Sequence, residues 1–121
     1  MNTSTIEKGQ DAEKLASEHL EKQGLTLIER NFRCPRGEID IIMEQGKTIV
    51  FVEVRYRKHT QFGTGAETVT KNKQSKLIMT AMYYLQKKPQ YSNRPSRFDV
   101  VSITPELHGP HIDWITDAFQ N

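Results

Sequence analysis

The sequence has few of the residues from which secreted and zinc-stabilised domains are built. It contains one cysteine, Cys34, among 121 residues. A single thiol cannot form a disulfide within the chain, and together with four scattered histidines it gives no zinc-finger spacing. We therefore expect neither a disulfide-stapled fold nor a structural zinc site, and a reducing, cytoplasmic environment is the default.

Long apolar runs are also missing. The longest, residues 39–43 and 49–54, each contain an acid and are far shorter than the roughly 20 residues that span a bilayer. Residues 1–9 are polar and have neither the apolar core of a signal peptide nor a cluster of arginines. The sequence therefore predicts a protein that does not enter the membrane.

Charge of one sign is not in large excess, because 17 lysines and arginines face 15 acids and the net charge is +2. This length suits one compact domain over residues 1–121, in which about residues 1–8 could be disordered. The charges are unevenly distributed: residues 61–97 hold seven basic side chains and one acid, whereas residues 98–121 hold four acids and no lysine or arginine. The cationic stretch could attract phosphates, and the alternative is an ordinary solvated helix face.

Hydrophobic periodicity predicts an α/β protein with a mixed sheet flanked by helices. The predicted helices cover residues 7–23 and 68–88, and the predicted strands cover residues 25–33, 38–44, 48–56, 98–103 and 111–115. Strand 48–56 is apolar on both faces, so we expect it at the centre of the sheet. The helix that follows it requires a crossover, which allows strands 48–56 and 98–103 to be parallel. Residues 89–96 contain two prolines and are expected to be irregular.

Two acids break the apolar pattern of the central strands. Strict alternation places Asp40 on the face of Ile42 and opposite Ile39, in a strand that otherwise looks buried. Glu53 interrupts the next strand, and a turn at residues 45–46 would bring the two carboxyls close together across a hairpin. A buried carboxylate must be paired, hydrogen-bonded or bound to a metal, and two that share a site are most readily held by a divalent cation.

The alternative for these acids is a set of structural ion pairs, in which Glu53 meets Arg55 or Arg57 and Asp40 meets a neighbouring arginine. Two further side chains bear on the choice. Glu13 borders the apolar stripe of the first helix and could face the same sheet. Lys73 lies on a buried-looking face of the second helix, although a lysine there can also snorkel to solvent.

Several short segments are specific in combination. They are Gly9-x-x-Ala12-Glu13-x-x-Ala16, Asn31-Phe32-Arg33, Gly37-Glu38-Ile39-Asp40-Ile41-Ile42, Phe51-Val52-Glu53-Val54-Arg55-Tyr56-Arg57, Lys73 and Arg97-Phe98-Asp99-Val100-Val101. Together they resemble the bacterial YraN family from about Gly9 to the end of the chain. That family is similar to the restriction-endonuclease-like PD-(D/E)xK superfamily and close to archaeal Holliday-junction resolvases.

The resemblance implies a restriction-endonuclease-like, three-layer α/β/α fold with a central mixed sheet and a metal-dependent nuclease site on the hairpin. Asp40 matches the metal-binding aspartate, Glu53 the first residue of the Glu-x-Lys signature, and Glu13 the acid of the first helix. With a backbone carbonyl near Val54, these acids would hold Mg²⁺ or Mn²⁺. Arg55 departs from the usual lysine, and its very high pKa makes arginine a poor general base.

The leading hypothesis is therefore a metal-dependent endonuclease that acts on DNA rather than RNA, including branched or flapped structures, with Asp40, Glu53, Arg55 and Glu13 as catalytic residues. Basic side chains would position the nucleic-acid backbone: Arg57, Lys58, Lys71, Lys73 and Lys76. The alternative is a catalytically reduced nucleic-acid-binding protein that keeps the fold, which Arg55 favours. A third class is an interaction module that docks a partner through the acidic tail around Trp114. A homodimer would suit a two-fold junction, by analogy with the resolvases.

Overall fold

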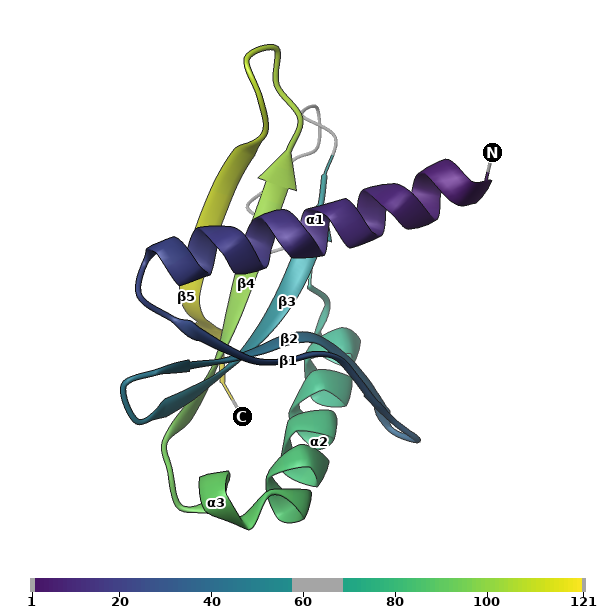
Figure 1. The fold of residues 1–121 in the computed structure, drawn as a ribbon. Helices are drawn as coiled ribbons and strands as arrows, with labels where there is room; N and C mark the ends of the chain where they lie inside the picture. Colours follow the sequence, from purple (N-terminus) through teal and green to yellow (C-terminus); the bar gives the residue numbers. More distant parts are fainter. Residues whose placement is uncertain (1, 58–68, 121) are drawn as a thin grey trace.

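The computed structural model describes residues 2–57 and 69–120, and it describes side chains from residue 11 onward within these ranges. The elements follow the predicted order (Figure 1). They are α1 (Asn2–Lys22), β1 (Thr26–Cys34), β2 (Gly37–Gln45), β3 (Thr48–Tyr56), α2 (Lys71–Lys87), α3 (Pro89–Ser92), β4 (Ser96–Thr104) and β5 (His111–Phe119). Lys58, one of the predicted nucleic-acid contacts, lies outside the described residues.

The strands form one mixed sheet in the order β1-β2-β3-β4-β5. Neighbouring strands are antiparallel except β3 and β4, which are parallel from Ile49↔Ser96 to Tyr56↔Ile103. The chain between these two strands carries α2, so the predicted crossover and its parallel pair are confirmed.

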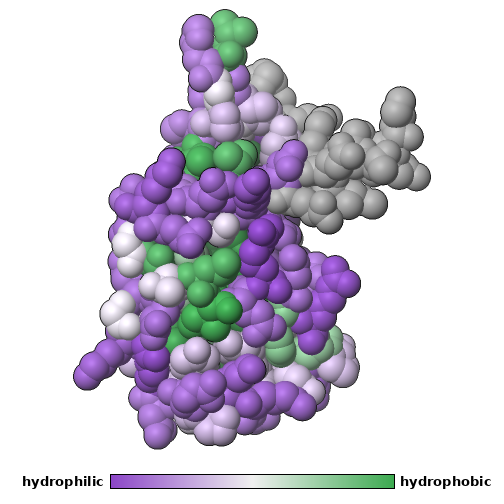
Figure 2. Space-filling view, viewed as in Figure 1, coloured by the Kyte–Doolittle hydropathy of each residue, from purple (hydrophilic) through white to green (hydrophobic). Residues whose placement is uncertain are grey.

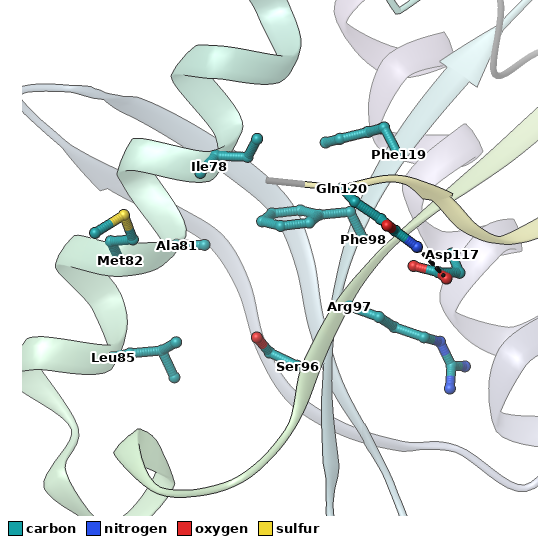
Figure 3. A pocket seen from close by; sticks show the side chains of 10 residues that line it. All are labelled: Ile78, Ala81, Met82, Leu85, Ser96, Arg97, Phe98, Asp117, Phe119 and Gln120. Carbon is teal, nitrogen blue, oxygen red and sulfur yellow. Dashed lines mark hydrogen bonds between the residues drawn. The ribbon is translucent and has the colours of Figure 1, made fainter.

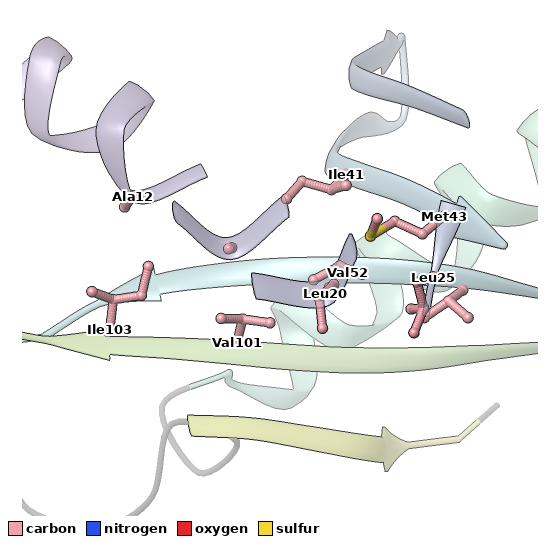
Figure 4. Close-up of a cluster of buried hydrophobic side chains, with 10 residues drawn as sticks. Ala12, Leu20, Leu25, Ile41, Met43, Val52, Val101 and Ile103 are labelled. Atoms are coloured by element: carbon pink, nitrogen blue, oxygen red, sulfur yellow. The ribbon is translucent and has the colours of Figure 1, made fainter. Parts of the chain in front are cut away.

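Each face of the sheet has its own core. On one face Ala12, Ala16 and Leu20 of α1 lie against Ile41, Val52 and other aliphatic side chains of the strands (Figure 4). On the other face Tyr84 of α2 is fully buried and meets the rings of Phe32 and Phe51 edge-on. β3 contributes to both cores, since its residues 49–53 are all buried. This is the three-layer α/β/α architecture with a central mixed sheet that the sequence predicts.

The largest differences from the predicted elements are at three places. α1 begins at Asn2, so it takes in most of the segment for which the sequence allows disorder, because each residue added to an existing helix gains a backbone hydrogen bond. Pro89 starts the single turn α3 within the segment expected to be irregular, because its fixed φ suits the first position of a helix. β5 continues to Phe119, beyond the predicted end at residue 115.

From the side that α1 covers, most of the visible surface is hydrophilic, and apolar side chains gather in small areas above and below the helix (Figure 2). None of the helices in the described ranges combines the length and apolarity needed to cross a bilayer.

One glycine is required by a close approach between layers. Gly37 begins β2 with φ +149°, and a Cβ at this position would lie 3.1 Å from the Thr80 hydroxyl oxygen of α2. Gly109 also has a positive φ, +118°, but nothing lies within 4 Å of its hypothetical Cβ. A side chain would strain the backbone at both positions, but it would meet a neighbouring atom only at Gly37.

We predict that Gly37→Ala lowers the free energy of unfolding by about 1–3 kcal/mol, and by more than Gly109→Ala does. Denaturant unfolding of both variants measures the difference. Adding Thr80→Ala, which removes the contacted oxygen, should recover part of the loss. Equal losses for Gly37→Ala and Gly109→Ala would show that the approach of α2 to β2 imposes no constraint.

Candidate active site

The candidate site lies where β2 and β3 separate. Their antiparallel pairing runs from Gln45↔Thr48 to Ile41↔Val52 and ends there. Beyond that point β2 stays with β1 as far as Gly37, while β3 stays with β4 as far as Tyr56. The separation opens a fork between the two central strands, with α1 on one side of it and the first turn of α2 on the other (Figure 1).

Asp40 lies at the opening of this fork. Its Oδ2 accepts a hydrogen bond of 2.9 Å from the backbone N–H of Val54, which the departing strand has left without a ladder partner on that side. The N–H and C=O of one strand residue point to the same edge of the strand, so the Val54 carbonyl also faces the fork. A carboxylate and a carbonyl oxygen therefore share this opening.

The side-chain alternation of β2 changes at Asp40. Ile41 belongs to the core under α1, whereas Ile39 and Ile42 both belong to the core under α2. The expectation that Ile39 lies on the opposite face from Ile42 is therefore wrong. The physical reason is a local distortion of the ladder, since Asn31 of the adjacent β1 has φ +56° and neither it nor Asp40 keeps a regular pair. The distortion turns the Asp40 carboxylate toward β3.

Glu53 brings a second carboxyl to the same place. Its side chain is 6% exposed, and its carboxyl lies close enough to that of Asp40 for the two groups to interact electrostatically. Burial, and then the neighbouring charge of Asp40, raise the pKa of Glu53 to about 8. Burial also raises the pKa of Asp40. Both shifts favour the protonated form, and a divalent cation between the two groups would oppose them.

Two cations contact the outer oxygen of Glu53. The Lys73 Nζ lies 3.5 Å from Glu53 Oε2, and an Arg55 terminal nitrogen lies 3.8 Å from the same atom. Lys73 reaches the fork because it is in the first turn of α2, where its N–H donates to the capping hydroxyl of Thr70. The structure therefore shows the expected contact of Glu53 with Arg55. It also shows a contact of Glu53 with a second cation, Lys73 of α2.

Glu13 approaches the fork from α1 and contacts Arg30 of β1 there. Its Oε1 lies 3.7 Å from a terminal nitrogen of Arg30 on β1. Burial and the charge of Asp40 raise the pKa of Glu13, and Arg30 opposes this effect. In the described ranges no three Asp, Glu, His or Cys side chains are arranged to hold a metal together. Asp40, Glu53 and the Val54 carbonyl thus converge, whereas Glu13 stays beside them.

The predicted backbone contacts have different surroundings. Lys71 and Lys76 are exposed on α2, and Lys73 is half-buried beside Glu53. Arg57 is 8% exposed at the end of β3, where its N–H donates to the Ile103 carbonyl. Arg57 is thus more buried than the exposed lysines of α2.

Sequence reasoning missed Arg30. β1 contains a bulge between Leu27 and Glu29, and this extra residue puts Arg30 opposite Ile41 on the face that α1 covers. Strict alternation from Leu27 would have turned Arg30 to the other face. The hydrophobic pattern gave no signal, because residues 29–31, which follow the bulge, are all polar.

A third buried carboxylate is structural. Asp99 of β4 is fully buried and accepts hydrogen bonds from Arg97, from the backbone N–H of Asp117 and from the indole of Trp114. Both of its carboxylate oxygens accept hydrogen bonds from residues of β4 and β5, so Asp99 is not part of the fork. Trp114, around which the interaction-module hypothesis places a docking surface, donates its indole N–H to Asp99.

A pocket of about 170 Å³ lies between α2 and the strands β4 and β5 (Figure 3). Its walls are mainly apolar, with Ile78, Leu85 and Phe98 around it and Arg97 and Asp117 among its polar lining residues. It contains neither Asp40 nor Glu53 and is therefore separate from the fork.

A protein-family model described as an uncharacterised family, UPF0102, matches residues 12–103. A UPF0102 protein of Pseudomonas fluorescens is 46% identical over 118 residues, covering 98% of this chain and 97% of its own. One from Saccharophagus degradans is 48% identical over 113 residues, covering 93% and 92%. Among solved structures, Pyrococcus furiosus SfsA in complex with Ca²⁺ aligns with a TM-score of 0.37 and 16% identity, over 93% of this chain and 63% of SfsA. An alignment this loose supports no argument about activity.

The raised pKa of Glu53 predicts how stability depends on pH in metal-free protein. Between about pH 4.5, its ordinary value, and about pH 8, the folded chain binds a proton at Glu53 that the unfolded chain does not. The free energy of unfolding should therefore decrease as pH rises through this window and level off above it. Glu53→Gln, which is neutral throughout, should remove much of this decrease, as measured by denaturant unfolding in EDTA.

Glu21→Gln provides the matched control, because Glu21 is exposed near the end of α1. It should keep the wild-type slope. If Glu53→Gln and wild type lose stability in parallel between pH 5 and pH 8.5, then Glu53 carries no extra proton in the folded protein.

Proposed function

We propose that this chain, which belongs to the uncharacterised protein family UPF0102, the YraN family that its segments resemble, is a divalent-metal-dependent endonuclease acting on DNA. The proposal rests on the geometry of the fork. The observation that carries the proposal is the convergence of the Asp40 and Glu53 carboxyls beside the Val54 backbone, at the opening between β2 and β3. The resemblance of the sequence to the PD-(D/E)xK superfamily supports the same reading.

The donor set of the fork fits Mg²⁺ or Mn²⁺. Both ions prefer carboxylate, carbonyl and water oxygens, and Mg²⁺ in proteins often uses one or two carboxylates and keeps several waters. Two buried carboxyls whose pKa values are raised would exchange protons for a divalent cation, which removes their repulsion. Such an ion, when bound, lowers the pKa of its water and offsets the charge of a phosphate.

The side chains around the pair have separable roles. The Val54 N–H fixes the direction of the Asp40 carboxylate, and Lys73 and Arg55 place positive charge beside Glu53. Arg55 is about one-third exposed, so its guanidinium can meet two oxygens of a phosphate and stabilise the charge that develops there. Lys73 provides the compact ammonium that arginine lacks.

The nucleic-acid backbone would be held by charge and shape. Lys71 and Lys76 are exposed on α2 next to the fork, where they can contact phosphates flanking the cut. We see no element among the described residues that is placed to read bases in a groove. Binding should therefore depend strongly on salt, and selection among duplex, flap and junction should depend on shape.

A second candidate is a DNA-binding protein that cleaves slowly or not at all. It is favoured by Arg55 at the position of the usual lysine and by the contact of two cations, Arg55 and Lys73, with Glu53. Binding that is unchanged by EDTA and by Glu53→Gln, with no cleavage under any metal, would identify this function.

We predict that Mn²⁺ raises the melting temperature of wild type but not of Asp40→Asn, because the variant loses one of the two carboxylates. The same substitution, and Glu53→Gln, should reduce cleavage of labelled duplex, flap and four-way-junction DNA by roughly 100-fold or more. Asp113→Asn, which changes an exposed carboxyl on β5, is the control and should behave as wild type. Cleavage by Asp40→Asn at the wild-type rate would refute the proposal.

A second prediction separates the two cations. Lys73→Met keeps the length of the side chain without its charge and should lower the cleavage rate roughly 100-fold while leaving the Mn²⁺-induced stabilisation in place. Arg55→Lys restores the usual residue and should cleave at least as fast as wild type. If Lys73→Met cleaves normally and Arg55→Lys is inactive, then the two cations have been assigned in the wrong order.

A further inference from the structure

Arg30 is a guanidinium whose hydrogen-bonding capacity is largely unused. Its Nε is buried and has no hydrogen-bond partner in the described part of the chain. Its nearest carboxylate, Glu13, lies 3.7 Å from one terminal nitrogen, which is beyond hydrogen-bond distance. Other arginines are better satisfied: Arg33 bonds Glu38 at 3.0 Å, and Arg97 bonds Asp99 through two nitrogens.

The position of Arg30 places this unused group at the fork. It pairs across the sheet with Ile41, the last residue of β2 that still pairs with β3. Its side chain faces α1, whereas Lys71, Lys73 and Lys76 belong to α2 on the other side of the sheet. The Arg30 side chain is 33% exposed although its Nε is buried, so a ligand can reach the terminal nitrogens from solvent.

We propose that Arg30 binds a backbone phosphate of the nucleic acid on the α1 side of the fork, and that Glu13 occupies it when nucleic acid is absent. This inference rests on the proposed function and extends it. A phosphate presents several oxygens in the spacing that a guanidinium recognises with two parallel hydrogen bonds. The backbone then crosses the end of the fork, from the lysines of α2 to Arg30.

The loose contact with Glu13 distinguishes this role from a structural one. A salt bridge that anchors α1 to β1 would bring two nitrogens within hydrogen-bond distance of the carboxylate, as Arg97 does with Asp99. Glu13 instead lies close enough to balance the charge of Arg30 and too far to satisfy its donors. Phosphate and Glu13 therefore compete for one guanidinium.

The test measures binding to a labelled four-way junction and a matching duplex by fluorescence anisotropy in EDTA, where cleavage plays no part. Arg30→Gln should weaken binding roughly 10- to 100-fold. It should also reduce the slope of log K against log salt by about 0.9, the share of one phosphate. Glu13→Gln should tighten binding about two- to fivefold, and the double variant should match Arg30→Gln.

Arg33→Gln is the matched control, because Arg33 is on the same strand, is more exposed and is paired with Glu38. It should change affinity by less than threefold. Equal effects of Arg30→Gln and Arg33→Gln would mean that only long-range charge matters, and this would overturn the assignment. A fall in melting temperature for Arg30→Gln and Glu13→Gln with unchanged affinity would show a structural pair and would also overturn it.

The outcome is independent of cleavage. If wild type binds DNA through Arg30 but cuts nothing with Mg²⁺ or Mn²⁺, then the phosphate site stands and the endonuclease activity fails. If wild type cuts DNA and Arg30→Gln binds and cuts normally, then the activity stands and the site fails. If wild type binds no DNA even at low salt, then the phosphate site is refuted.

Discussion

The separation of β2 from β3 is the constraint on which the rest of the site depends. A strand that leaves its neighbour exposes backbone groups that must be satisfied, and here the Asp40 carboxylate accepts the N–H of Val54 in place of the missing ladder bond. The same departure aims the Val54 carbonyl at the opening and leaves room for Glu53 beside Asp40. One hydrogen bond thus both closes the end of the sheet and fixes the candidate metal ligands.

The large features were predictable because they follow from burial. β3 had to be central, since Val50 and Phe51 fill opposite faces, and a helix after it had to cross over. Asp40 and Glu53 stood out because acids are costly in such strands. That they lie close together follows from the register of one short hairpin, and the turn residues 45–46 indicate that register. Their roles in metal binding and catalysis stay predictions.

The remaining features depend on irregular backbone that periodicity does not encode. The bulge in β1 turns Arg30 toward α1, where it lies beside Glu13. At the other edge, a register shift between Phe98 and Val100 and a positive φ at Asp117 accompany the continuation of β5 to Phe119. Asp99 accepts the N–H of Asp117 there, a long-range contact that sequence patterning cannot reveal.

The double burial of β3 has a consequence for how the site meets its ligands. Residues 49–52 of this strand are packed under both helices and hydrogen-bonded to a strand on each side, so local opening there approaches the cost of global unfolding. Glu53 and Val54 follow directly on the same strand. Their oxygens therefore belong to a preorganised frame, and a cation that binds them spends little of its affinity on ordering the chain.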